Sequence, residues 1–511
     1  MIKNYTASAD NTIVNAFQEN LETRGTGSNT GRADILEVYS VYGRQTTSSQ
    51  ELSRVLIKFP IDQIANDRTN SRIPASGSVN FFLNLYDAQT SRTVPNNMIL
   101  TVNPLFNDWQ EGVGLDLEGY KDLTKGNEGS NWMSASATAS WNSVSGGGDF
   151  LSSSADYRYQ QLFRNGIENL SIDITPLVER WITGSSGGGI ANYGMGIKLT
   201  SSQEAKGFGI KVHASSDQPT QNIPDGATKS YYTKRFFARG TQYYFKRPTI
   251  QAKWNSARQD HRGQFYISSS LAKGENINDI YFYNYVRGRL RTIPSGDSLT
   301  VSIYSSSAGE PTSTRLRIKN SSNVYGDSVT ATEVETGVYK ARLQVVENLS
   351  TLHDVWSLGS AQIHTGTINT VSMGTAVHAR EPTYFINITN LQNSYMSNQT
   401  ARFNLYVREK NWNPTIYTKA VASAPTVTIP SASYRVLRIF DNQEVVAHDT
   451  GSGLLATGLS YDVSGNYFDF DMKLLEPDYE YGFKLAFYDE ELSSWQEQNE
   501  LFKFRVNKNE Y

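Results

Sequence analysis

The sequence predicts an all-β protein made of β-sandwiches arranged in tandem. Apolar and polar residues alternate with a period of two wherever a period can be read, as in half-buried strands. The composition favours strands and turns, with 30 tyrosines and 39 glycines. A chain of 511 residues is also too long for a single hydrophobic core, so two to four domains are expected.

The strands are predicted from alternating segments that Gly, Pro or Asn clusters separate. In chain order these segments are Ser53–Ile61, Ser78–Ala88, Met98–Leu105, Ser298–Ser306, Val338–Val346, Ala401–Glu409, Ser433–Asp441 and Phe502–Val506. Each can place one face on a core and the other toward solvent, which is what a sandwich requires.

One segment has a clear helical pattern, Ile174–Gly184. We expect Thr175 to be the N-cap, Pro176 to occupy the first helical position and Gly184 to end the helix. One buried stripe is predicted, formed by Leu177, Val178, Trp181 and Ile182. The prediction is therefore one short helix in an otherwise β protein.

Three domains are predicted, at residues 1–255, 262–377 and 380–511. The polar and charged run Asn255–Gln264 is interpreted as a linker between the first two. Glycine- and serine-rich stretches at Ser143–Gly148 and Gly184–Gly189 are interpreted as long loops inside the first domain.

Charge and cysteine content exclude several classes of protein. The formal net charge of −3 gives no general attraction to nucleic acid or to an anionic membrane. The chain has no cysteine, which excludes thiol catalysis, disulfides and zinc–thiolate sites. No window approaches eighteen apolar residues, and the N-terminal residues lack a secretory signal pattern, so neither a membrane span nor a leader is expected.

The first domain resembles the DNRLRE family, β-sandwich domains found on bacterial surface proteins and some virion proteins. The matching elements are Ala7–Phe17, Asn29–Tyr39, Ser53–Asp62, Asp108–Gly112, Ser140–Phe150, Leu170–Leu199 and Arg235–Trp254. The resemblance implies a jelly-roll-like sandwich scaffold without catalysis of its own. It carries over no active-site residue.

The second and third domains resemble immunoglobulin-like (Ig-like) modules of phage appendages and bacterial surface proteins. In the second, Val334–Thr370 contains a T-G-x-Y-x-A corner, a tryptophan and a returning strand. In the third, Glu476–Glu490 contains the aromatic strand expected before a terminal hairpin. The resemblance implies two Ig-like sandwiches.

An acidic loop, DWQEGVGLDLEGYKD at Asp108–Asp122, is the first candidate site. Its carboxylates, Asp108, Glu111, Asp116, Glu118 and Asp122, could bind calcium, although the spacing is not that of an EF-hand. Two of them, such as Glu111 and Asp116, could instead form the acid and base pair of a glycosidase.

The interpretation we favour for this loop is architectural. Trp109 would close the end of the sandwich, Gly112 and Gly114 would shape the turn, and the acidic side chains would face water. No catalytic residue and no cofactor are therefore predicted, and Asp108, Glu111 and Asp116 remain calcium candidates.

Other catalytic patterns are missing from the sequence. The six histidines include no pair at i, i+2 or i, i+4 and no HExxH motif, so no metal-hydrolase ligand set is visible. No GxSxG element is present, and the glycine-rich stretches lack GxGxxG spacing.

Two segments rich in arginine and tyrosine are candidate interfaces, Lys229–Pro248 and Tyr281–Arg291. The first mixes basic and aromatic residues as single-strand-binding proteins do, but alternation should direct its aromatics inward and its Lys and Arg to solvent. A protein contact is therefore favoured over nucleic acid. The interface candidates are Tyr243, Tyr244, Arg247, Tyr283, Tyr285 and Arg287.

The sequence therefore favours a non-catalytic structural protein of a tailed bacteriophage virion, in the neck or collar, the tail or the outer head. Other virion proteins are the expected partners, in a symmetric homo-oligomer assembled in the host cytoplasm, with no nucleic acid or membrane contact. The alternative is a bacterial cell-surface or secreted carbohydrate-binding adhesion protein. Its candidate sugar-stacking residues are Trp109, Trp132, Trp141 and Trp412.

Overall fold

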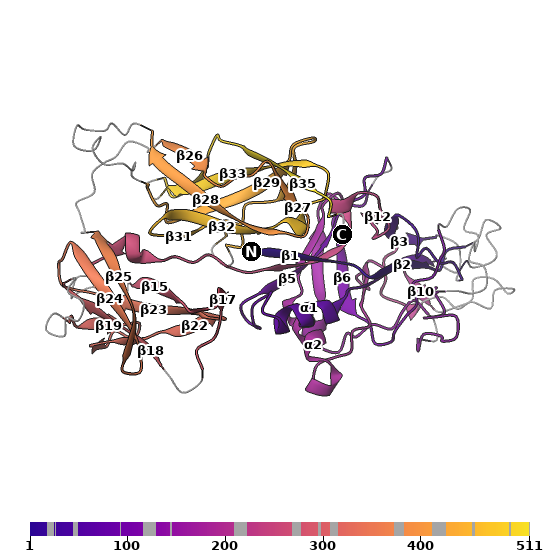
Figure 1. Cartoon of the computed structure of the whole chain (residues 1–511). Coiled ribbons are helices and arrows are strands. Elements are labelled where there is room, and N and C mark those ends of the chain that lie inside the picture. Colours follow the sequence, from indigo (N-terminus) through magenta and orange to yellow (C-terminus); the bar gives the residue numbers. More distant parts are fainter. Residues whose placement is uncertain are drawn as a thin grey trace. The chain divides into compact units, whose positions relative to one another are not determined.

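The computed structural model (Figure 1) describes residues 1–17, 25, 27–43, 50–91, 94–115, 129–143, 146–208, 222–267, 277–294, 298–306, 315–371, 383–410, 426–451, 455–489 and 492–509. They form two compact units, Ile2–Trp254 and Asn255–Tyr511, and Met1 belongs to the second. Both units are built from antiparallel sheets, with two parallel strand pairs, β14–β25 and β27–β35, at sheet margins of the second unit, so the predicted all-β class is confirmed.

The N-terminal unit contains two main sheets. The four-stranded sheet has the order β1 (Ile2–Thr6), β13 (Thr249–Lys253), β5 (Asn80–Leu85), β8 (Leu170–Asp173). The seven-stranded sheet has the order β12 (Tyr231–Phe237), β3 (Ile35–Tyr42), β4 (Gln50–Lys58), β9 (Met195–Leu199), β6 (Met98–Pro104), β7 (Tyr159–Phe163), with β2 (Ala9–Val14) paired to β4. A small ladder joins β10 (Gly207–Phe208) and β11 (Asn222–Ile223). The strand β1 pairs with β13, so the first and last strands of the unit are neighbours in the four-stranded sheet.

Two α-helices lie in the described part of this unit, α1 (Ile61–Thr69) and α2 (Thr175–Thr183), where one was predicted. Figure 1 shows them close together, and Arg68 on α1 donates two 2.6 Å hydrogen bonds to Glu179 on α2. α1 buries only Ile61, Ile64 and Asp67, so its apolar pattern is too short to read as a helix. No helix in the described residues is long and apolar enough to cross a membrane.

The N-cap of helix α2 lies one residue earlier than predicted. Ile174 is the N-cap and Thr175 is the first helical residue. Thr175 is held by two partners, because its hydroxyl donates to Asp173 Oδ1 (2.6 Å) and accepts from the Phe81 amide (2.8 Å). Gly184 ends the helix with a φ of +68°, where glycine carries no steric cost.

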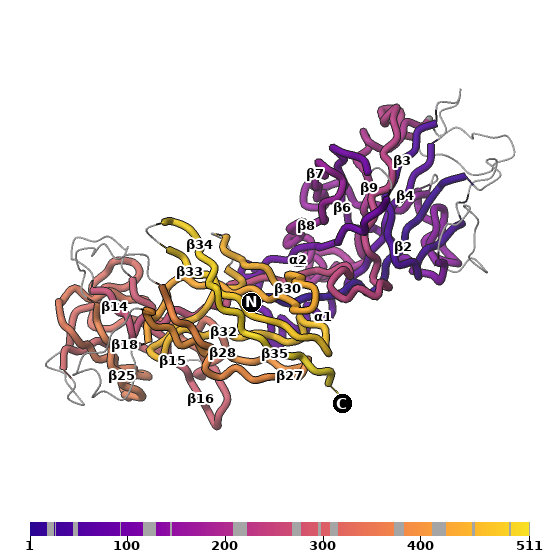
Figure 2. Tube along the Cα trace, turned by 90° about the horizontal axis from the view of Figure 1, so that it is seen from above, coloured from indigo at the N-terminus to yellow at the C-terminus, as the bar shows by residue number. Residues whose placement is uncertain are grey.

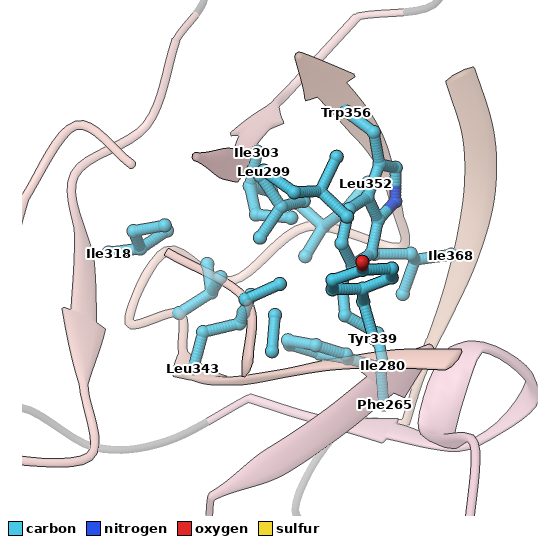
Figure 3. Packing of buried hydrophobic residues seen from close by; sticks show 14 residues of the cluster. Phe265, Ile280, Leu299, Ile303, Ile318, Tyr339, Leu343, Leu352, Trp356 and Ile368 are labelled. Carbon is cyan, nitrogen blue, oxygen red and sulfur yellow. The ribbon is translucent and has the colours of Figure 1, made fainter. Parts of the chain in front are cut away.

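The second unit begins with two facing five-stranded sheets, the middle sandwich. One has the order β14 (Phe265–Tyr266), β25 (Ala361–Val371), β24 (Thr351–Leu358), β18 (Leu299–Tyr304), β21 (Val329–Thr330). The other has the order β15 (Asn278–Tyr283), β23 (Val338–Gln344), β19 (Ile318–Asn320), β20 (Tyr325–Gly326), with β22 (Thr332–Glu335) paired to β23. A separate hairpin joins β16 (Tyr285–Val286) and β17 (Arg289–Leu290). Figure 3 shows the core between the sheets, where Trp356 and Leu352 of one sheet approach Tyr339 and Ile280 of the other.

The C-terminal sandwich completes the second unit. Its sheets have the orders β26 (Tyr384–Ile388), β28 (Thr400–Glu409), β32 (Gly465–Asp471), β31 (Ser460–Asp462) and β27 (Ser394–Met396), β35 (Phe502–Asn507), β33 (Glu480–Asp489), β29 (Ala432–Arg438), β30 (Gln443–Val446). The strand β34 (Ser494–Glu497) pairs with β33. Its core is aromatic: Phe403, Tyr434, Phe468, Phe483 and Phe504 stack or meet edge to face with centroids 4.6–6.3 Å apart.

Short 3₁₀ turns connect several strands: η3 (Ala155–Tyr157), η4 (Ser185–Gly187), η5 (Tyr244–Lys246), η6 (His261–Gly263) and η8 (Met472–Leu474). The run predicted as a linker, Asn255–Gln264, includes η6 and is ordered within the second unit. The Tyr461 amide donates to Arg258 O (2.9 Å), and the Asp260 amide donates to Tyr461 O (3.0 Å). The segment therefore extends alongside β31.

Candidate functional site

The acidic side chains of this loop that the structure describes, Asp108 and Glu111, form ion pairs with basic residues. Asp108 accepts a 2.8 Å hydrogen bond from Lys58 and remains exposed to solvent. Glu111 accepts two 2.6 Å hydrogen bonds from the Arg239 guanidinium and one of 2.8 Å from the Asp10 amide. The calcium candidate Asp116 lies outside the described residues, as do Glu118 and Asp122. Within the described residues, no three His, Cys, Asp or Glu side chains are grouped to hold a metal ion.

The turn of this loop closes on Asn29. The Asn29 amide group donates to the carbonyls of Glu111 and Ser130 at 2.7 Å each, and its oxygen accepts from the Gly114 amide at 3.0 Å. A Cβ on Gly114 would lie 1.6 Å from the Asn29 carbonyl oxygen, so only glycine fits there. Hydrogen bonds from Asn29 thus fix the turn of the loop against the segment that precedes β3.

The tryptophans proposed for sugar stacking are core residues where the structure describes them. Trp109, Trp132 and Trp141 are buried in one cluster with apolar residues of β2 and β4. The indole N–H of Trp109 donates to Tyr193 O and that of Trp141 to Asn131 O, both at 2.9 Å. Their assignment to an exposed sugar platform was therefore wrong, because these rings fill the end of the sandwich. Trp412 lies outside the described residues.

The basic segment Lys229–Pro248 differs from its prediction at Lys234, whose side chain is fully buried instead of facing solvent. Lys234 shares the inner face of β12 with the buried Phe236 because the two are alternate residues of the strand, and the pairing of β12 with β3 shifts register just before Lys234. Its ammonium group donates to Asp87 and, at 2.9 Å each, to the carbonyls of Gly166 and Glu168. Burial lowers the pKa of Lys234, and Asp87 opposes that shift.

A buried carboxyl group lies beside the acidic loop. Asp10 is almost completely buried, and its Oδ2 accepts a 2.6 Å hydrogen bond from the Arg239 amide. Burial raises the pKa of Asp10 to about 7, and the nearby negative charge of Glu111 adds to the shift. The folded unit therefore binds a proton at Asp10 over a pH range in which the unfolded chain has released it.

This shift predicts a pH dependence of stability. Because the folded pKa is the higher one, the stabilisation is complete below about pH 4 and is lost as the pH rises through 7. Relative to Asp10→Asn, the wild-type free energy of unfolding should fall by on the order of 1–3 kcal/mol between pH 5 and pH 8. Urea unfolding of the wild-type and Asp10→Asn chains at several pH values checks this, and parallel dependences of the unfolding free energy on pH would contradict it.

The six interface candidates fall into two groups on different units. In the N-terminal unit, Tyr243 is 54% exposed and meets Phe237 edge to face. Tyr244 is half-buried, and Arg247 packs its guanidinium over the Tyr244 ring and donates to Thr241 O (3.2 Å). This group is therefore partly engaged within its own unit, with Tyr243 as its most exposed member.

In the second group, Tyr285 and Arg287 lie on the β16–β17 hairpin, which Figure 2 shows extending from the middle sandwich, and Tyr283 ends β15 just before it. Its turn residues Arg287 and Gly288 have φ of +51° and +75°, the signs expected of a type I′ turn. Tyr285 is 62% exposed and stacks on the half-buried Tyr283, and Val286 is also exposed. Within the described residues, no acidic side chain pairs with Arg287, Arg289 or Arg291.

The base of this hairpin is held firmly. The Asn284 side chain donates to Arg291 O (2.6 Å), the Arg291 amide donates to Asn284 O (3.0 Å), and the Asn284 amide donates to Gly337 O (2.8 Å). A Cβ at Gly337 would lie 2.5 Å from the Arg291 nitrogen, so the contact requires glycine. The hairpin therefore presents exposed tyrosine, valine and arginine side chains from a fixed support.

One further feature was not predicted from the sequence, a cavity of about 260 Å³ inside the second unit. Asp279, Tyr281, Lys340 and Trp495 are among the residues that line it. A partial signal was present: Asp279 and Tyr281 flank the apolar Ile280 in an alternating strand, so they face away from the core.

Comparisons with known proteins give the following results. No family model matches the sequence. No curated protein matches it. Among solved structures, the chain is similar to the Yersinia pseudotuberculosis adhesin InvE (11% identity, TM-score 0.14, 47% of this chain and 56% of that chain). It is also similar to the Escherichia coli adhesin FdeC (10% identity, TM-score 0.15, 54% and 77%) and to the tandem Ig repeats of Dlar (9% identity, TM-score 0.13, 50% and 97%).

The chain thus spans little more than half the length of the Yersinia adhesin. Similarity at these TM-scores supports no transfer of function. The assignment of tandem sandwiches rests on the paired sheets of this chain itself.

Proposed function

We propose that this chain is a non-catalytic structural protein that acts by assembly with other copies of itself and with further proteins. The observation that carries the proposal is the β16–β17 hairpin. It combines an exposed tyrosine, an exposed valine and arginines on a firmly held support. Tyrosine and arginine are the residue types enriched among the side chains that dominate binding energy in protein interfaces.

Charge favours a second copy as the partner of this hairpin. The segment 285–291 contains three arginines and no acidic residue, in a chain whose formal net charge is −3. The rest of each chain is therefore net acidic, which complements the basic hairpin of a neighbour. The environment of the acidic loop agrees with a scaffold role, because Glu111 and Asp108 are bound to Arg239 and Lys58.

In its finer form, the proposal makes the protein a component of a tailed bacteriophage virion, in the neck or collar, the tail or the outer head. Tandem sandwiches whose surfaces bind neighbours suit a particle in which many copies repeat by symmetry. Other virion proteins would then be the partners, and assembly would take place in the host cytoplasm.

Light scattering of the full chain across a concentration series tests the assembly. The wild type should form a defined oligomer, and the double substitution Tyr285→Ser with Arg289→Ser should weaken its formation at least about tenfold, because both side chains are exposed on the hairpin and are of the types that anchor interfaces. Phe440→Ser is the matched control, since Phe440 is an exposed aromatic residue outside the hairpin. A wild type that stays monomeric, or a variant that assembles as well as the wild type, would contradict the proposal.

A further inference from the structure

The cavity in the second unit is lined by three parts of the chain. The extended segment after β13 contributes alternate residues, Asn255, Ala257 and Gln259. The strands β15 and β23 contribute Asp279, Tyr281 and Lys340. The C-terminal sandwich contributes Trp495 and a group of apolar and small residues, Pro430, Ser431, Ala432, Leu455, Gly458 and Leu459.

The polar residues of β15 and β23 belong to the outer face of their sheet. Ile280 and Ala341 point into the core of the middle sandwich, so their neighbours in sequence point away from it. Tyr281 and Lys340 are cross-strand partners, and Asp279 lies two residues before Tyr281 on the same face. The three side chains are therefore adjacent on one wall of the cavity.

These groups have hydrogen-bonding capacity left over. The Lys340 ammonium lies 3.7 Å from Asp279 Oδ2, which is beyond hydrogen-bond distance. Asp279 is instead bound by Arg342, whose Nε donates to Oδ1 at 2.7 Å. Burial raises the pKa of Tyr281, and the structure places no hydrogen-bond partner at its hydroxyl within the described residues. Lys340 and Tyr281 can therefore donate to a molecule in the cavity.

Charge and shape restrict what that molecule can be. The charged residues that line the cavity are Lys340 and Asp279. Arg342, which lies outside the lining, donates to Asp279 and offsets its charge, so Lys340 is the cation left to attract an anion. The lining also includes the Trp495 ring with Leu455 and Leu459, which suits an apolar face of the bound molecule. The volume of about 260 Å³ lies just below the roughly 300 Å³ at which small-molecule pockets begin, so it suits a single small ring.

We propose that the cavity binds a carboxylated monosaccharide unit of the uronic acid type. Lys340 would receive the carboxylate, the Tyr281 hydroxyl and the amide groups of Asn255 and Gln259 would bind ring hydroxyls, and Trp495 would cover the apolar face of the ring. This site is independent of the hairpin and of the assembly proposed above. It also replaces the buried tryptophans of the N-terminal unit as the place where a sugar binds.

Isothermal titration of the full chain tests the site, with D-glucuronic acid, D-glucose and acetate as separate probes. Glucuronic acid should bind saturably and at least about tenfold more tightly than glucose, which lacks the carboxylate, or acetate, which lacks the ring. Lys340→Met should weaken binding about tenfold or more, and Tyr281→Phe should weaken it by a smaller factor. Lys503→Met, which removes an exposed lysine outside the cavity, should change nothing.

Unfolding temperatures and near-ultraviolet circular dichroism of each variant separate lost binding from lost folding. If Lys340→Met does not fold, two measurements still test the site: the comparison of the three probes on the wild type, and the affinity of the Tyr281→Phe variant. The proposal is overturned if glucuronic acid gives no saturable binding, if glucose or acetate binds as tightly, or if a folded Lys340→Met protein keeps its affinity.

Discussion

Replacing Lys234 with methionine is expected to destabilise the N-terminal unit by about 3–5 kcal/mol, the range for removing one partner of a buried ion pair. The side chain is completely buried between Phe163 and Phe236, whose ring centroids lie 5.3 and 5.0 Å from its nitrogen. Methionine fills the space but leaves the Asp87 carboxylate and two carbonyl oxygens without their donor. Urea unfolding, with hydrogen exchange of β12 and β7 to locate the change, measures the effect.

Lys58→Met is the matched control for this prediction. Lys58 also pairs with an aspartate of the same unit, Asp108, but Asp108 is exposed and Lys58 is only partly buried. Its removal should cost no more than about 1 kcal/mol, as for surface ion pairs. Equal losses of unfolding free energy in the two variants would show that the buried pair of Lys234 stabilises the unit no more than a surface pair does.

The second large effect is expected in the middle sandwich, where Asp354→Ala should cost about 3–5 kcal/mol. Asp354 is completely buried, and its Oδ2 accepts from Trp356 Nε1 at 2.6 Å and from Arg262 Nη2 at 2.9 Å. Alanine would leave the indole N–H without an acceptor inside the core and would open a void beside it. Calorimetry of the full chain should show a lower unfolding temperature for the transition of the second unit.

The control for Asp354 is Asp469→Ala, which removes the partner of Arg402 in an exposed bidentate pair. We expect a loss of about 1 kcal/mol or less from this variant. If Asp354→Ala is as mild as Asp469→Ala, the buried pair does not hold η6 against the middle sandwich.

The fold could be predicted from the sequence where alternation was long and uninterrupted. The segments predicted at Ala401–Glu409 and Ser433–Asp441 correspond to β28 and β29, because each buries alternate residues against one core. The pattern failed at Ser53–Ile61, where β4 ends at Lys58 and α1 begins at Ile61. Pro60 marks that boundary, but only two apolar residues of α1 are buried, too few to show a helical period.

The surface roles of charged and aromatic residues were harder to predict, because they depend on contacts distant in sequence. Lys234 is buried because it alternates with Phe236 on the inner face of β12, where Asp87 and two distant carbonyl groups accept its hydrogen bonds. The loop tryptophans are buried because segments far apart in sequence converge on them, as Tyr193 does on Trp109. The cavity also depends on residues separated by more than 200 positions, such as Asn255 and Trp495.

The central claim, that the β16–β17 hairpin mediates assembly, is tested most directly by amide hydrogen exchange of the full chain at low and high concentration. The measurement reports protection residue by residue as copies associate. The account predicts that the amides of residues 283–291 become protected when the oligomer forms. An oligomer in which these amides exchange as fast as in the monomer, while protection appears elsewhere, would contradict it.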